Sequence, residues 1–234
     1  MGNALKFIMQ TQNIKMKRII IFSSLLLIIG LSCNKVNFNY PKGTVGSSRI
    51  VYFATISTNG GKIVATQQGD PYTDQGATAT VNNAPINYTT DGTVDINTPG
   101  VYTLTYTATN AEGFSSSDWR MVVVVPVGVW QDPVVKANDF SGVYLRGTVT
   151  STWTKIATGV YQVENPGGSS GVGKLVAAVN YSDHNIQIPP QNAPDFGQVK
   201  SSDESYTVGP PTTYSWKFFA PGYGTQLRTF VKQQ

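Results

Sequence analysis

The sequence predicts an all-β protein, and three observations support this fold class. In residues 101–109, tyrosine, leucine and alanine occupy the even positions, and threonine occupies most of the odd positions. This two-residue period is typical of a strand with one buried face. Turn-forming pairs such as Asp91-Gly92 and Pro99-Gly100 interrupt the apolar segments repeatedly. No segment keeps the 3.6-residue period of an amphipathic helix for more than two turns. We therefore expect antiparallel strands in two successive domains.

The chain opens with a pattern typical of a secretory leader. Basic residues at 15, 17 and 18 precede a 13-residue apolar run, Ile19–Leu31, and small Ser32 and the single cysteine, Cys33, follow it. A run of this length is too short for a membrane-spanning helix, which needs about 20 residues, but it suits a signal peptide. We expect residues 1–32 to be the signal peptide, with its true start at Met16. A lone cysteine at this place resembles a bacterial lipoprotein processing site, which implies lipidation of Cys33.

Charge and cysteine content exclude several classes of protein. The formal charge of +4 comes from four basic residues before Cys33, so residues 33–234 carry 13 basic and 13 acidic side chains and no net charge. A nucleic-acid partner is set aside, because binding phosphates needs a dense basic surface. With no second cysteine, the mature chain forms no internal disulfide.

Composition divides the mature chain into segments. Residues 33–48 lack periodicity and are rich in Asn, Gly, Ser and Pro, which predicts a flexible tether. Residues 49–126 and 134–234 are rich in strand patterns and form the two expected domains. Residues 127–133 are the expected linker between them.

In the first domain, turn residues predict two hairpins. The expected strands and turns are Arg49–Ser57, Asn59-Gly60-Gly61 and Lys62–Thr66 for the first, and Ile86–Thr90, Asp91-Gly92 and Thr93–Ile96 for the second. The clearest strand is Val101–Thr109, whose Tyr102, Leu104, Tyr106 and Ala108 share one face. Met121–Val125 is continuously apolar and ends at Pro126, which predicts a strand buried on both faces.

Three blocks in this domain carry a family resemblance. Asp70–Ala79, Gly92–Asp95 and Pro99–Gly113 resemble, in order, a bacterial immunoglobulin-like repeat that occurs in surface proteins. The resemblance covers about residues 50–126 and implies an immunoglobulin-like β-sandwich. It departs from the family pattern at Asn110 and Gly113-Phe114, which weakens any transfer of a cation site to this loop.

The sequence of the second domain predicts an antiparallel β domain, either a sandwich or a small barrel. Its expected strands are Gly142–Val149, Thr152–Ile156, Val160–Glu164, Lys174–Asn180, Tyr206–Val208, Tyr214–Phe219 and Gln226–Val231. Residues 167–171 are expected to be a mobile loop, and residues 188–194 a proline-rich excursion. Phe140–Arg146, Gly159–Tyr161, Ser215–Phe218 and Pro221–Tyr223 resemble a C-terminal domain of Bacteroidetes-type lipoproteins. That resemblance implies a place beside outer-membrane glycan-uptake systems of the starch-utilisation type.

Residues for catalysis or metal binding are scarce. The single histidine, His184, is expected to be a solvated turn residue rather than a catalytic base, and one histidine without a free cysteine cannot build a zinc site. Glu164 and Glu204 are the glutamates of the second domain, and nothing in the sequence pairs them as glycosidase carboxylates. Asp70, Asp74, Asp91 and Asp95 lie in turn-rich stretches without the spacing of a calcium loop. We therefore expect neither an enzyme nor a bound cofactor or metal.

Carbohydrate binding is the remaining chemistry with residues to support it, because sugars stack on exposed aromatic rings. Trp153 lies in a polar run and Tyr223 between two glycines, so these two are expected to be exposed. Tyr214, Trp216 and Phe218 alternate on one face, which favours the core, although Trp216 stays a candidate. The candidate ligand-binding residues are Trp153, Tyr223 and Trp216.

The hypothesis that follows is a non-catalytic, extracytoplasmic lipoprotein, anchored in the outer membrane through Cys33. It would bind a polysaccharide or oligosaccharide as an accessory of an outer-membrane transporter, with the first domain as a spacer. The alternative is a structural or adhesive protein that makes only protein–protein contacts. Gly30 replaces the leucine common three residues before such a cysteine, and Asn34-Lys35 replaces an acidic run. Both a surface and a periplasmic orientation therefore stay open.

Overall fold

The structure is a computed structural model that describes residues 41–42, 44–45, 48–169, 173–181 and 185–233. The expected signal peptide, Cys33 and His184 lie outside the described residues. In the unit formed by residues 1–50, β1 (Thr44–Val45) pairs antiparallel with β2 (Ser48–Arg49). Residues 51–234 form the second unit, which holds both expected β domains.

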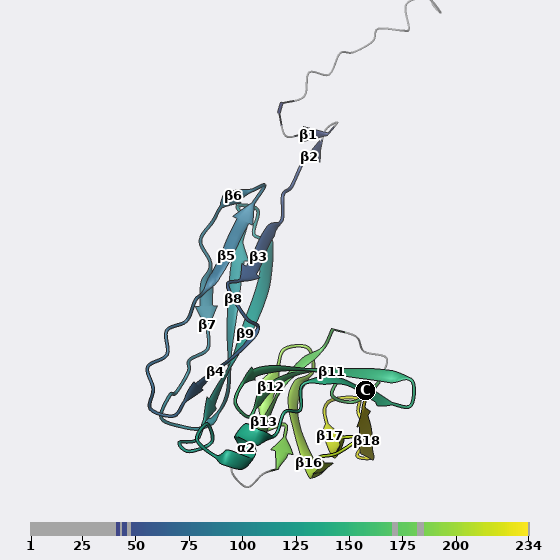
Figure 1. The fold of residues 1–234 in the computed structure, drawn as a ribbon. Helices are drawn as coiled ribbons and strands as arrows, with labels where there is room; N and C mark the ends of the chain where they lie inside the picture. Colours follow the sequence, from purple (N-terminus) through teal and green to yellow (C-terminus); the bar gives the residue numbers. More distant parts are fainter. Residues whose placement is uncertain (1–40, 43, 46–47, 170–172, 182–184, 234) are drawn as a thin grey trace, which may run out of the picture. The chain divides into compact units, whose positions relative to one another are not determined.

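The first domain is a sandwich of two sheets (Figure 1). One sheet has three strands in the order β3 (Ala54–Thr58), β5 (Ala77–Val81) and β6 (Ala84–Pro85). The other has four strands in the order β4 (Ile63–Gln67), β9 (Ser115–Val125), β8 (Gly100–Thr109) and β7 (Thr89–Asp91). Neighbouring strands are antiparallel except β4 and β9, which run parallel.

The two strands predicted most clearly are confirmed, with longer bounds in each case. In β8, Leu104, Tyr106 and Ala108 are buried, as the alternation indicates. The apolar end of β9, residues 121–125, is at most 1% exposed. Val122 belongs to the sandwich core, whereas Met121, Val123 and Val125 pack in a cluster with residues of the second domain. The strand is apolar on both faces because each face meets a different core.

Neither predicted hairpin of the first domain is formed. β3 pairs with β5 and β4 pairs with β9, so the turn at Asn59-Gly60-Gly61 carries the chain from one sheet to the other. Gly60 does have the expected positive φ, 77°. β7 pairs with β8, and residues 93–96 form no strand. A turn signal marks a change of direction, but it does not determine which strand becomes the partner.

The expected linker, residues 127–133, packs against the second domain. Val129 is fully buried and belongs to the same apolar cluster as Val135. The only helix among the described residues, α2 (Pro133–Ala137), begins here. Asp132 caps it, because its carboxylate accepts hydrogen bonds from the amides of Val134 and Val135 at 2.8 and 3.1 Å.

One nine-stranded sheet makes up the second domain. Its strands, in spatial order, are β14 (Ile186–Gln187), β13 (Leu175–Asn180), β12 (Val160–Glu164), β11 (Val149–Ala157), β10 (Gly142–Arg146), β18 (Leu227–Lys232), β17 (Thr213–Phe219), β16 (Gly197–Thr207) and β15 (Gln191–Ala193). The expected strand 142–149 is divided by a turn at Gly147, and the proline-rich excursion contains β15. The all-β prediction is confirmed in both domains.

The sheet curls until its two ends meet. Trp153 on β11 and Tyr214 on β17 lie three strands apart in the sheet, about 14 Å if the sheet were flat. Their ring centroids are only 4.6 Å apart. At the ends, the amide of Ser201 on β16 donates to the carbonyl of Ile188 next to β14 at 3.0 Å. Aromatic side chains fill the enclosed interior, which is therefore a packed core.

Candidate functional site

Two of the three candidate binding residues lie in this core. The expected exposure of Trp153 is wrong, since the side chain is 2% exposed. Its Nε1 donates to the Tyr214 hydroxyl at 3.0 Å, and its ring stacks on that of Trp216 at 5.4 Å. Trp216 is fully buried, so its assignment to the core is confirmed. The adjacent Thr152 and Thr154 lie on the opposite face of β11 from Trp153, which is why the run looks exposed.

Tyr223 is the candidate whose ring stays half-buried, in the loop between β17 and β18. One side of the ring packs edge-on against Phe218 and Phe196, with centroids 5.1 and 5.8 Å away. Its hydroxyl shares a 2.8 Å hydrogen bond with Ser169. A Cβ placed on Gly167 would come within 2.3 Å of the ring, so the close approach of this loop requires glycine there.

The expected mobile loop is ordered over its described part. Gly167 and Gly168 are buried. Asn165 holds this segment to the sheet, because its Nδ2 donates to the carbonyls of Thr150 and Ser169, both at 2.7 Å. Residues 165–169 thus support the Tyr223 ring through packing and hydrogen bonds.

Two arginines that the sequence analysis did not single out belong to this region: Arg228 lies beside the Tyr223 ring, and Arg146 lies beside Gly168. On β10 the buried Tyr144 is followed two residues later by Arg146, and on β18 the buried Phe230 is preceded two residues earlier by Arg228. Side chains two apart share one face of a strand, so both arginines continue the inward-facing rows of the curled sheet. The sequence signal that could have identified them is an arginine two residues away from an apolar residue on the buried face of the same strand.

Both arginines donate to backbone carbonyls, and Arg228 also lies over the Tyr223 ring. Nη1 of Arg146 donates to Gly168 at 3.2 Å. Nη1 of Arg228 donates to Gly224 and Gln226 at 3.2 and 3.1 Å, and its guanidinium lies 5.7 Å from the centre of the Tyr223 ring. Among the described residues, no carboxylate forms an ion pair with either arginine. The pKa of Arg228 is lowered, first by burial and then by the nearby charge of Arg146.

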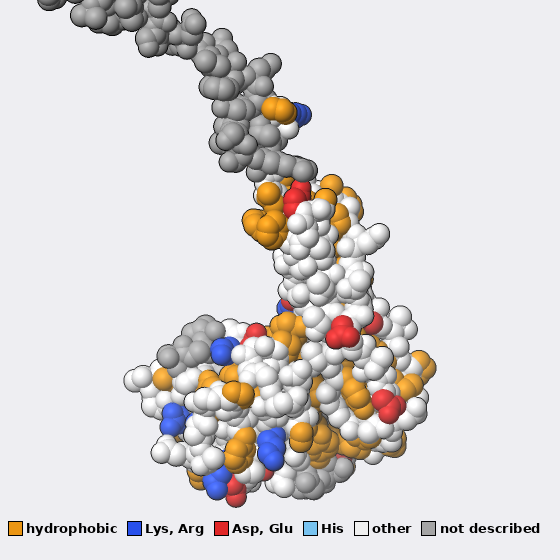
Figure 2. All heavy atoms as spheres, turned by 180° about the vertical axis from the view of Figure 1, so that it is seen from behind, with side chains coloured by type: hydrophobic (Ala, Val, Ile, Leu, Met, Phe, Trp, Pro, Cys, Tyr) orange, Lys and Arg blue, Asp and Glu red, His pale blue; other side chains and the backbone are white. Residues whose placement is uncertain are grey.

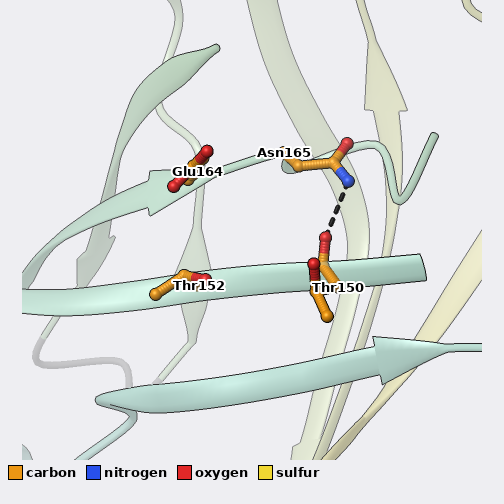
Figure 3. Close-up of a pocket in the computed structure, with 4 residues that line it drawn as sticks. All are labelled: Thr150, Thr152, Glu164 and Asn165. Carbon is orange, nitrogen blue, oxygen red and sulfur yellow. Dashed lines mark hydrogen bonds between the residues drawn. The ribbon is translucent and has the colours of Figure 1, made fainter. Parts of the chain in front are cut away.

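A small pocket lies beside β11 and the end of β12 (Figure 3). Thr150 and Thr152 from β11 line it, together with Glu164 and Asn165 at the end of β12. The Glu164 carboxylate accepts a hydrogen bond from the amide of Gly173 at 2.7 Å. Glu204 instead accepts one from Ser201 at 2.5 Å, so each glutamate has a local partner.

The aspartates of the first domain do not gather into a cation site. Among the described residues, no group of three or more His, Cys, Asp or Glu side chains is placed to hold a metal ion. Asp74 lies in a different polar cluster, where it accepts hydrogen bonds from the hydroxyls of Tyr72 and Tyr106 and pairs with Arg120. This cluster is internal to the sandwich.

The arrangement of the first domain agrees with a sequence comparison. Residues 56–124 match the family described as bacterial surface protein, Ig-like domain. The expected immunoglobulin-like domain is therefore confirmed over these residues. A search of the curated proteins finds no significant match to this chain.

Two solved structures are also similar. The lipoprotein BT2262 from Bacteroides thetaiotaomicron is 24% identical, with a TM-score of 0.42, over 77% of this chain and 100% of that chain. The M60 catalytic domain with the CBM51-1 and CBM51-2 domains from Clostridium perfringens ZmpB is 11% identical, with a TM-score of 0.31, over 79% of this chain and 20% of that chain. Neither score supports a shared function. Within the described residues, no helix is long and apolar enough to cross a membrane.

Proposed function

We propose that this protein is a non-catalytic lipoprotein that is anchored in the outer membrane through Cys33 and binds glycans beside Tyr223. The observation that carries the binding role is the half-buried Tyr223 ring, fixed by Phe218, Ser169 and Gly167 and flanked by the guanidinium of Arg228. A rigid aromatic platform with polar groups around it is the arrangement that saccharide binding requires. The match to a bacterial surface domain supports an extracytoplasmic location.

Anchoring is tested by replacing the thiol that would carry the lipid. Each acyl CH₂ buried in a bilayer contributes about 0.8 kcal/mol, so two or three chains hold the protein stably on the membrane. We expect Cys33→Ser to move the protein from the membrane fraction to the aqueous fraction, with loss of the acyl mass by mass spectrometry. A wild-type protein without acyl mass would refute the anchor. Antibody labelling of intact cells then distinguishes the surface from the periplasm.

Glycan binding is tested by affinity electrophoresis of the acylated protein, in a non-ionic detergent, against a panel of polysaccharides. We expect at least one polysaccharide to retard the wild type and Tyr223→Ala to abolish that retardation. Tyr52→Ala is the matched control, because Tyr52 is a 43% exposed tyrosine in the first domain. Equal retardation of both variants would remove Tyr223 from the site. No retardation of the wild type would end the glycan proposal.

The alternative, an adhesive or structural protein, is favoured by an apolar patch on the sandwich. Phe53 and Phe114 are 63% and 47% exposed, and their rings meet edge-to-face at 5.2 Å. Figure 2 shows hydrophobic side chains gathered at one end of the sandwich. If protein contacts are the function, Phe53→Ser should abolish cross-linking of the protein to a partner on cells. In that case no glycan should retard the wild type.

A further inference from the structure

We propose that the Tyr223 site selects saccharides that carry an oxyanion, a carboxylate or a sulfate ester, and that Arg146 and Arg228 bind that group. The inference deepens the proposed function, because it names the class of glycan that the same site takes. It starts from Arg228, which lies over the Tyr223 ring, and from Arg146, which donates to Gly168, next to the Gly167 that packs against that ring. Neither arginine forms an ion pair with a described carboxylate.

The donors of the two arginines are only partly used. Each guanidinium offers five N–H groups in a planar fork that fits a carboxylate or a sulfate through two parallel hydrogen bonds. In both side chains only Nη1 donates to a described acceptor. Nε and Nη2 meet none among the described residues. An oxyanion would satisfy these donors and offset the repulsion between two neighbouring positive charges.

The site is also rigid before any ligand binds. Arg228 is 8% exposed and lies over the Tyr223 ring. Arg146 passes close to Gly168, where a Cβ would come within 2.9 Å of the arginine Cδ, and Gly168 has a φ of +54°. Side chains that are already ordered lose little conformational entropy on binding, which favours affinity. The side chains of both arginines are thus held in position by packing before a ligand binds.

The positive charge is local. Residues 33–234 carry equal numbers of basic and acidic side chains, so a general attraction for polyanions is not expected. An acidic sugar ring offers an apolar C–H face for Tyr223 and an oxyanion for the arginines. A neutral sugar offers only the first of these.

The test compares acidic and neutral polysaccharides with the acylated full-length protein in a non-ionic detergent. Polygalacturonate carries carboxylates, dextran sulfate carries sulfate esters, and pullulan carries neither. We expect one or both acidic polymers, but not pullulan, to retard the protein, and Arg146→Gln to weaken binding at least tenfold. Retardation by one acidic polymer alone identifies which oxyanion is bound.

Lys200→Gln is the matched control. Lys200 is exposed, and its ammonium lies 5.9 Å from the centre of the Phe219 ring, so it is also a cation beside an aromatic ring, but on β16. Its loss should change binding less than twofold. Arg228→Gln should act like Arg146→Gln, provided that circular dichroism and the melting temperature show a folded protein.

The outcomes separate this inference from the proposed function. If pullulan retards the protein as strongly as the acidic polymers and Arg146→Gln has no effect, selection for an oxyanion is refuted while glycan binding stands. If no polysaccharide retards the wild type, glycan binding fails. The anion site is then tested with monomeric galacturonate and inorganic sulfate by NMR. Shifts that Arg146→Gln abolishes support it, and their absence refutes it.

Discussion

Replacing Arg120 with methionine is the sharpest test of how the sandwich is held together. Arg120 is 1% exposed and pairs with Asp74, and it donates to the carbonyls of Asn59 and Gly61. It thereby joins β9 to the turn that crosses between the sheets. Methionine keeps much of the apolar stem but removes every donor.

The expected cost follows from what the substitution leaves behind. Removing one partner of a buried ion pair costs about 3–5 kcal/mol, because the other charge stays buried without compensation. Asp74 is 25% exposed, and it keeps hydrogen bonds from Tyr72, Tyr106 and the amide of Gly76. These contacts lower the expected loss in the free energy of unfolding to about 2–4 kcal/mol.

Urea unfolding at pH 7, followed by circular dichroism, measures this loss. Lys62→Met is the control, because Lys62 pairs with Asp118 on the same domain while its side chain is 34% exposed. A pair of that kind contributes about 0–1 kcal/mol. Asp74→Asn added to Arg120→Met removes the unpaired charge, so the double variant should be more stable than additivity predicts. If Arg120→Met costs no more than Lys62→Met, the argument is wrong.

The pH dependence provides a second readout of the same cluster. Burial alone would raise the pKa of Asp74, but the hydroxyls of Tyr106 and Tyr72 and the charge of Arg120 outweigh it, so its pKa is lowered. A carboxyl group with a lowered folded-state pKa stabilises the protein above its unfolded pKa, near 4, and this stabilisation is lost as the pH falls through the folded value. Stability should therefore decline in acid less steeply in Arg120→Met than in the wild type.

Two further predictions concern the second domain. Tyr214→Phe should lower the free energy of unfolding by about 1–3 kcal/mol in urea titrations, because the Trp153 indole N–H loses its buried acceptor; a loss below 0.5 kcal/mol would show that this bond is unimportant. Gly167→Ala should displace the Tyr223 ring and cost about 1–3 kcal/mol, whereas Gly224→Ala, with no atom within 4 Å of the added Cβ, should cost less than about 0.5 kcal/mol. Equal melting temperatures for the two glycine variants would contradict this account.

Local patterns in the sequence predicted some strands well, but they missed β5 and most of β16, of which only the end near Tyr206 was expected. β12 has the expected bounds, and β8 and β9 contain the expected segments, because period two and continuous apolarity depend only on which faces a strand buries. Pairing was predicted poorly. The partners of β3 and β4 lie far along the chain, and nothing in a turn dipeptide specifies them.

The residues of the candidate site were likewise predicted only in part. Tyr223, singled out for its glycine neighbours, is half-buried, whereas Trp153 was wrongly expected to be exposed and Arg146 and Arg228 were not singled out. Whether a ring on a strand faces solvent depends on how far the sheet curls, and the contact of Trp153 with Tyr214 across three strands results from that curl.

The sequence by itself determined an all-β chain with an immunoglobulin-like first domain, because alternation, turn residues and the family blocks are local properties. Only the tertiary structure decided that the aromatic rings of the second domain fill its interior and that Arg228 lies beside Tyr223, with Arg146 near Arg228. The physical reason is that closure of the nine-stranded sheet brings together side chains from strands distant in sequence. That closure arises from twist and packing summed over the whole sheet.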